Sequence, residues 1–139
     1  MGLFAWNDAY VLGLPLIDNE HRALFAAADE LSDAVARGDG TRAVKNLFTR
    51  LSSTLTTHFE HEEALMRHYR YPDVEDHLDE HRTVLDRMTR AQKNLEAGAL
   101  NIPSDILQFL RNWMDRHIRK YDQAAVRHIR ANSMAVLGS

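Results

Sequence analysis

Apolar residues recur at helical spacing along nearly the whole chain, and glycine or proline interrupts this pattern at only a few points. The interruptions fall at Gly38 and Gly40, at Pro72, and at Gly98 followed by Pro103. The segments between them predict helices over about 18–37, 41–69, 74–97 and 104–130. Long helices joined by short connections favour an all-α fold, an antiparallel up-down-up-down four-helix bundle.

The chain has 139 residues, enough for one domain with a real core. We therefore expect a single domain over 1–139, with an irregular arm (1–17), a bundle (about 18–130) and a short tail (131–139). Asp18 is a candidate cap for the first helix, and Ser104 for the fourth. The apolar residues of the arm that we expect to pack across the bundle are Trp6, Tyr10, Val11, Leu14 and Leu16.

Composition excludes several classes of function. The net charge is −3 and the basic residues are scattered, so we expect no nucleic-acid partner. No apolar run approaches the roughly 20 residues that span a bilayer, so we expect no membrane insertion. The absence of cysteine excludes disulfides, thiolate zinc sites and iron–sulfur clusters, and it fits a cytoplasmic protein.

The stretch HFEHEE, residues 58–63, holds two histidines and three glutamates in six positions. A helix advances about 100° per residue, so His58 and Glu62 share the apolar stripe of this segment. Glu60 and Glu63 point to the solvent side, and His61 lies on a flank. Only His58 and Glu62 are therefore expected to reach the core, and we treat His61, His68 and His128 as surface or flank residues.

The same phase argument places a histidine in the core from every helix. The core-facing set besides His58 consists of His21, His77, His81 and His117. One histidine on an apolar face is usually a hydrogen-bonded core residue. Several unpaired histidines and a glutamate would instead cost several kcal/mol each, more in total than the roughly 5–15 kcal/mol that stabilises a domain. A buried metal site removes this difficulty, because the metal uses the lone pairs.

The fourth helix presents a spacing problem. Asp122 follows His117 by five residues, which places it about 140° away on a regular helix. One extra residue in a π-type turn between them would bring Asp122, Ala125, Val126 and Ile129 inward. Without it, Tyr121, Ala124 and His128 would face the core, a less apolar set. Because π-type turns are frequent at functional sites, we predict one between 117 and 122.

Five imidazoles and two carboxylates exceed what one ion can bind, so the count predicts two ions bridged by the carboxylates. A nitrogen and oxygen ligand set without thiolate suits iron or manganese and leaves zinc open. Ferritin-like di-iron bundles use Glu-x-x-His on two helices, and this sequence contains no such motif.

The combined pattern is His21, His58-x-x-x-Glu62, His77-x-x-x-His81 and His117-x-x-x-x-Asp122. With Trp6, IDNEHR (17–22), YP (71–72) and HI (117–118), it resembles the hemerythrin family, specifically the single-domain bacteriohemerythrins, over residues 4 to about 130. Glu20 departs from the family pattern, since many relatives have Gln there. Because it is not a ligand, we expect it to leave the chemistry untouched.

The resemblance implies two non-haem iron ions joined by an oxo or hydroxo group. His77, His81 and His117 would bind one iron, and His21 and His58 would bind the second, which keeps an open position. Glu62 and Asp122 would bridge both. In the family, O2 binds reversibly at the open, five-coordinate iron and is held there as hydroperoxide. Ile118 and Trp113 are candidates to line the O2 pocket.

The resemblance therefore implies an oxygen-binding protein for carriage, storage or delivery, rather than an enzyme. O2 is the expected partner, and an oxygen-using enzyme is a candidate recipient. One alternative is a peroxidase-like or oxidase-like di-iron enzyme. The other is an O2 or redox sensor, although 139 residues leave little space for an output domain.

Overall fold

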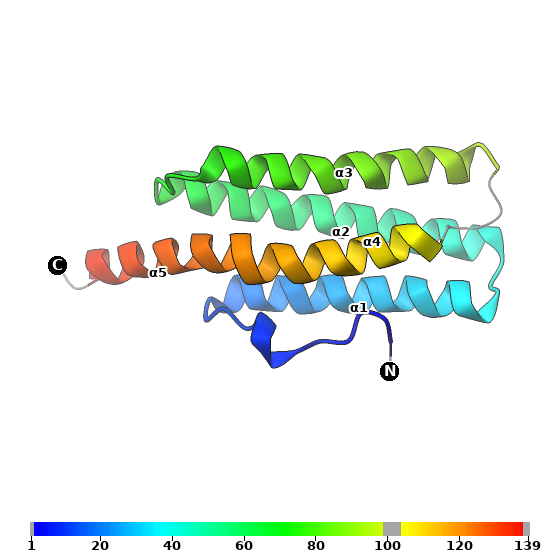
Figure 1. Cartoon of the computed structure of the whole chain (residues 1–139), viewed down its shortest axis with the longest axis horizontal. Coiled ribbons are helices and arrows are strands. Elements are labelled where there is room, and N and C mark those ends of the chain that lie inside the picture. The colour runs from blue at the N-terminus through cyan, green and yellow to red at the C-terminus, as the bar shows by residue number, and fades with distance from the viewer. Residues whose placement is uncertain (1, 99–103, 138–139) are drawn as a thin grey trace.

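The computed structural model describes residues 2–98 and 104–137, which are helical apart from the arm and the connections. In chain order the elements are η1 (Asp8–Tyr10), α1 (Pro15–Arg37), α2 (Thr41–His68), α3 (Val74–Glu96), α4 (Ser104–Arg116), η2 (His117–Asp122) and α5 (Gln123–Leu137). The last three elements form one continuous helical rod, which is the fourth helix of the bundle (Figure 1).

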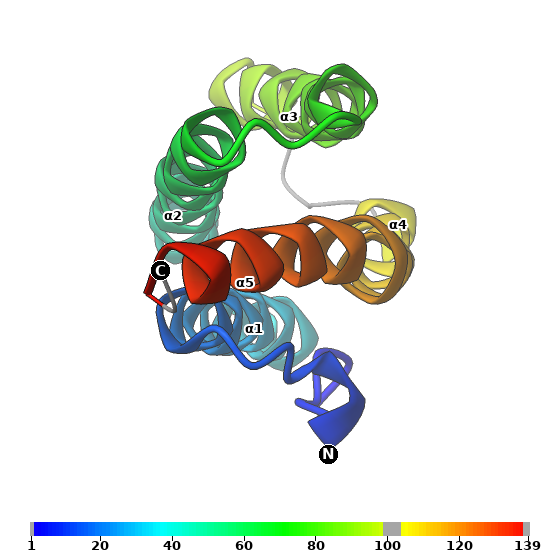
Figure 2. The same cartoon turned by 90° about the vertical axis from the view of Figure 1, so that its left-hand side faces the viewer.

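The four helical rods alternate in direction. Figure 2 shows α1, α2, α3 and the α4–α5 rod arranged around a common interior, with α1 beside α2 and α2 beside α3. This is the antiparallel up-down-up-down bundle that the sequence predicts. In the described residues, no helix has the length and apolar composition needed to cross a bilayer.

The helix boundaries differ from the predictions at two points. The first helix begins at Pro15 rather than at Asp18, because a proline suits the first turn, where its missing N–H would have no intrahelical partner. The fourth rod continues to Leu137, beyond the predicted end near Arg130, and projects past the other helices in Figure 1. The prediction for the Ser104 side chain lies outside the described side chains.

Asp18 ties the arm to the bundle instead of capping a helix. Its two carboxylate oxygens accept the backbone N–H groups of Leu12, at 2.8 Å, and Gly13, at 3.0 Å. Gly13 has a φ of +86°, a left-handed conformation that glycine adopts without strain. The arm therefore reverses direction at this point and enters α1.

The arm packs through fewer residues than predicted. Tyr10 is buried, and Phe4, which the sequence pattern did not select, is also buried. Val11 and Leu16 are exposed, so their predicted packing is wrong. Leu16 lies in the first turn of α1, where the next residue, Ile17, is the one that faces the core. The Tyr10 hydroxyl donates to Oδ1 of Asp115 at 2.6 Å and joins the arm to α4.

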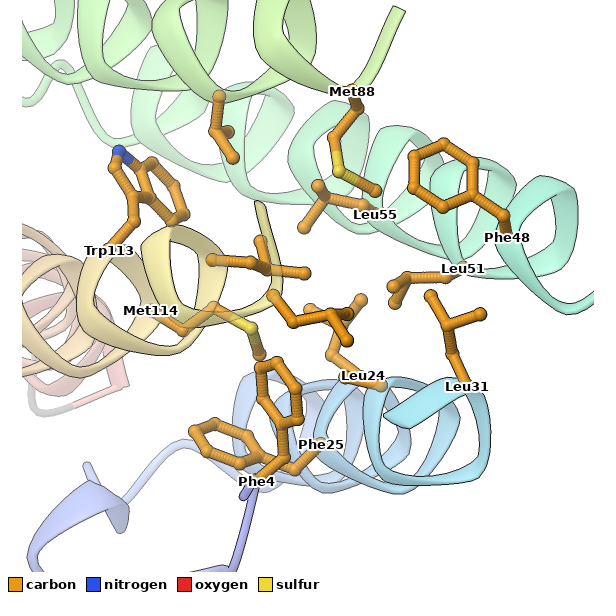
Figure 3. Packing of buried hydrophobic residues seen from close by; sticks show 14 of the residues in the cluster. Phe4, Leu24, Phe25, Leu31, Phe48, Leu51, Leu55, Met88, Trp113 and Met114 are labelled. Carbon is orange, nitrogen blue, oxygen red and sulfur yellow. The ribbon is translucent and has the colours of Figure 1, made fainter. Parts of the chain in front are cut away.

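The main apolar cluster fills one half of the bundle, and further apolar side chains, among them Ile17, Met66 and Val126, are buried in the other half. Figure 3 shows Leu24 and Leu31 of α1 facing Leu51 and Leu55 of α2, with Met114 of α4 beside them. The buried histidines lie in the other half, near the start of α1, the end of α2 and the start of α3. Each histidine is thus held on a rod that a large apolar interface already fixes in place.

Candidate metal centre

The seven predicted ligand residues all lie together and all are buried. They fall into two sets of potential donors that share both carboxylates: Glu62, His77, His81, His117 and Asp122 form one, and His21, His58, Glu62 and Asp122 form the other. Within each set, the donor atoms lie within 4.8 Å of one another. The structure therefore brings all seven residues of the sequence pattern together.

Helical phase on α2 selects the inward residues as predicted. His58 and Glu62 lie one turn apart and are buried, whereas Glu60 and His61 are exposed. His68 is exposed as well, and Nε2 of the half-buried His128 lies 2.7 Å from the backbone oxygen of Tyr69. None of these three histidines belongs to the buried cluster.

The predicted π-type turn spans His117–Asp122. It places His117 and Asp122 on the same face of the rod, and both side chains are buried. After the turn, Ala125, Val126 and Ile129 are buried, whereas Ala124 is exposed. The extra residue in the turn therefore directs Asp122 inward, and it also directs inward the apolar residues that follow Asp122 on the rod.

The two carboxylates divide their oxygens between the histidines. Glu62 Oε2 lies 2.8 Å from His58 Nε2 and 3.3 Å from His21 Nε2. Its Oε1 lies 3.2 Å from His81 Nε2 and 3.3 Å from His77 Nε2.

Asp122 follows the same arrangement. Its Oδ2 lies 3.0 Å from His21 Nε2, and its Oδ1 lies 2.9 Å from His77 Nε2 and 3.0 Å from His117 Nε2. The oxygens and the Nε2 nitrogens thus surround two neighbouring points, each near oxygens of both acids.

Of these contacts, His21 Nε2 to Glu62 Oε2 has the geometry of a hydrogen bond, but most of the others do not. The buried atoms without a hydrogen-bond partner include Nε2 of His58, His77, His81 and His117, together with Oε1 of Glu62 and Oδ1 of Asp122. Leaving so many buried polar atoms unpaired costs about 1–3 kcal/mol each. Donor atoms that converge on shared points rather than on one another fit cations placed between them.

The charges of the cluster are strongly coupled. Burial lowers the pKa of His21, but its contacts with Asp122 and Glu62 outweigh burial and raise it to about 10. For His77, too, the contacts with Asp122 and Glu62 outweigh the effect of burial and raise the pKa to about 9. Burial raises the pKa of Glu62, yet His58, His21 and His77 hold it well below its usual range. The acids are therefore ionised, and their negative charge attracts protons or metal cations.

Two glutamates contact the outer nitrogens of two histidines, a role that was not predicted for either glutamate from the sequence. Glu20 Oε1 lies 2.7 Å from His58 Nδ1, and Glu63 Oε2 lies 2.8 Å from His81 Nδ1. Glu63 was expected on the solvent side, but it is only partly exposed. Helical phase on one helix cannot reveal these contacts, because each glutamate reaches a histidine on a neighbouring helix.

Aromatic side chains stack on two of the histidine rings. Phe59 stacks on His81 with ring centroids 3.7 Å apart, and Trp113 stacks on His117 at 4.2 Å. A small cavity of about 10 Å³ lies beside His21 and His58, and both predicted pocket residues, Trp113 and Ile118, line it. Its volume is near the lower limit for one water molecule, which is also the scale of a diatomic gas.

Comparisons with known proteins agree with this geometry. The model of the hemerythrin HHE cation binding domain matches residues 12–129. A bacteriohemerythrin of Methylococcus capsulatus is 29% identical over 124 residues, which cover 88% of this chain and 94% of the relative. A bacteriohemerythrin of Stenotrophomonas maltophilia is 29% identical over 133 residues, covering 95% of this chain and 85% of the relative.

Solved structures give the same result. The crystal structure of a wild-type hemerythrin superposes with a TM-score of 0.84 at 25% identity and covers 90% of this chain and 96% of its own. A leucine-to-tyrosine variant of a hemerythrin gives a TM-score of 0.86 at 26% identity, covering 93% and 98%. Because the family model matches most of the length of this chain, the chain belongs to the hemerythrin HHE cation-binding domain family.

Proposed function

We propose that the chain binds O2 reversibly at a non-haem di-iron centre, for carriage, storage or delivery of oxygen. The observation that carries this proposal is the division of the Glu62 and Asp122 oxygens between two groups of histidines. His77, His81 and His117 would hold one iron, and His21 and His58 the other. Glu62 and Asp122 would bridge the pair.

When bound, two iron ions supply the redox chemistry through which O2 can bind and be released. The protein supplies donors and a dry environment. Neutral imidazoles add no negative charge, so only the two carboxylates offset the charge of the metals. The cavity beside His21 and His58 has apolar walls from Leu24, Leu55 and Ile118, which exclude water from the side nearest those histidines.

The buried charges also favour a binding role over catalysis. Among the described residues, Asp18 is the only buried carboxylate outside the seven-residue cluster, and the hydroxyl of the buried Tyr10 donates to Asp115. The Asp18 carboxylate is occupied by two backbone N–H groups of the arm. In the described residues, the Asp18 carboxylate and the Tyr10 hydroxyl are thus both engaged in contacts that hold the arm.

Cycling the iron-loaded protein between argon and O2 while recording its visible spectrum tests the proposal. We expect an absorption band that grows with O2 and disappears when O2 is removed, over several cycles. A band that bleaches irreversibly, with oxidation of an added donor, would instead support the di-iron enzyme.

A further inference from the structure

We propose that Glu20 is a positioning residue for His58 and that the surface residue His61 holds Glu20 in place. The proposal rests on the proposed function only in taking His58 as a metal ligand. It gives a role to two side chains that the ligand pattern leaves out. All three residues meet where α1 packs against α2, because Glu20 lies on α1 and the histidines lie on α2.

The contact with Glu20 determines which nitrogen of His58 faces the centre. His58 Nδ1 lies 2.7 Å from Glu20 Oε1, and Nε2 of the same ring lies 2.8 Å from Glu62 Oε2. An ionised carboxylate accepts hydrogen bonds and donates none, so Nδ1 carries the hydrogen and donates a hydrogen bond to Glu20. The lone pair of Nε2 is then free to bind a cation.

Glu20 is itself fixed from outside. Its second oxygen, Oε2, lies 2.5 Å from Nδ1 of His61. The side chain of Glu20 is 21% exposed and that of His61 is 49% exposed, so this pair connects solvent to the buried ring of His58. A surface groove lined by Ala23, Ser53, Thr54 and Thr57 also reaches Glu20 and His58. Without His61, the Glu20 carboxylate could turn into this groove.

The contact is selective within the cluster. His81 has an equivalent partner in Glu63, at 2.8 Å. By contrast, Nδ1 of His21, His77 and His117 has no hydrogen-bond partner in the described part of the chain, although Glu80 Oε1 lies 3.7 Å from His117 Nδ1. One histidine of each metal group is therefore held by a carboxylate. An acceptor on the outer nitrogen makes the imidazole a stronger donor, and removing such a partner commonly weakens metal affinity 10–100-fold.

The test compares Glu20→Ala, Glu20→Gln and His61→Ala with the wild-type protein. Glu60→Gln is the matched control, since Glu60 is an exposed glutamate on the same helix as His61. Iron-loaded proteins are mixed with excess chelator, and the rate of iron release and the reduction potential are measured. We expect about tenfold faster release for Glu20→Ala, a smaller acceleration for His61→Ala, and no change for Glu60→Gln.

Glu20→Gln separates positioning from simple packing. Its amide oxygen can still accept from Nδ1 but carries no charge. We therefore expect it to restore near wild-type iron retention relative to Glu20→Ala, with a reduction potential shifted to more positive values. A Glu20→Ala protein with wild-type iron release and potential would overturn the proposal.

A second measurement does not depend on iron. In metal-free protein labelled with ¹⁵N at histidine, we expect a His58 Nδ1–H resonance protected from exchange, and its loss in Glu20→Ala. An unprotected Nδ1–H in the wild-type protein would overturn the proposal. Loss of reversible O2 binding in a protein that retains its iron contradicts the proposed function alone, because neither iron release nor the Nδ1–H signal requires O2.

Discussion

Glu62 and Asp122 each divide their two carboxylate oxygens between two groups of histidines. One oxygen of each acid lies near His21, and for Glu62 also near His58. The other oxygen lies near His77 and, in addition, near His81 for Glu62 or His117 for Asp122. Glu62 comes from α2, and Asp122 comes from the π-type turn of the fourth rod. Because the two acids approach from different rods, the centre forms only when the bundle is assembled.

Removing Glu62 tests its bridging position. We expect Glu62→Ala to lose most of its iron, because both proposed metal positions lose an oxygen donor in a single substitution. Glu60→Ala, two residues away on the exposed face, should retain the wild-type iron content. Iron per chain, measured after gel filtration, distinguishes them, and full iron and O2 binding in Glu62→Ala would refute the bridging role.

The π-type turn predicts opposite results for a deletion and an insertion. Deleting the exposed Lys120 leaves His117 and Asp122 four residues apart, which a regular helix keeps on one face. Inserting an alanine after Lys120 instead rotates Asp122, Val126 and Ile129 by about 100°.

We therefore expect the deletion to keep the fold and the insertion to cost roughly 3–5 kcal/mol, as when large core side chains are lost. Denaturant unfolding followed by circular dichroism measures both. Equal stability of the insertion variant and the wild-type protein would show that the phase after the turn does not matter.

Ile118 tests the cavity wall. Ile118→Ala should lower the free energy of unfolding by roughly 2–5 kcal/mol, and Ile118→Val by about 0.5–1.5 kcal/mol. The enlarged cavity should also admit water and shorten the lifetime of the O2-bound form. The decay of the O2-dependent absorption band gives that lifetime. A lifetime unchanged in Ile118→Ala would argue that the O2 pocket lies elsewhere.

The contact between the arm and α4 predicts a step in stability at high pH. Burial and the hydrogen bond to Asp115 raise the pKa of Tyr10 from 10 to about 12. The folded state holds the proton more tightly, so this contribution is fully present below pH 10 and is lost as the pH rises through 12. Tyr10→Phe should lower stability at neutral pH by roughly 1–2 kcal/mol and should remove the step. A wild-type pH profile in Tyr10→Phe would contradict this assignment.

The sequence predicts the bundle and the seven-residue cluster because both depend on helical phase. His58 and Glu62 fall in one stripe by their spacing alone. Asp122 required an additional argument, namely that a π-type turn places a more apolar set behind it. These features follow from local periodicity, so they can be predicted without any knowledge of how the helices pack.

Contacts between side chains of different helices could not be predicted from the periodicity of each helix. Glu20 and Glu63 look like solvated surface when their own helices are considered, yet each meets a histidine of a neighbouring helix. Val11 and Leu16 were misplaced because hydrophobicity alone does not decide which side chains of the arm and of the first turn of α1 face the core.

The most direct test of the account is the ratio of O2 to iron to protein in anaerobically loaded chain titrated with O2. Two metal positions joined by two carboxylates predict two irons per chain and one O2 bound per iron pair, with all of the O2 recovered under argon. One iron per chain, or O2 consumed without recovery, would contradict the account.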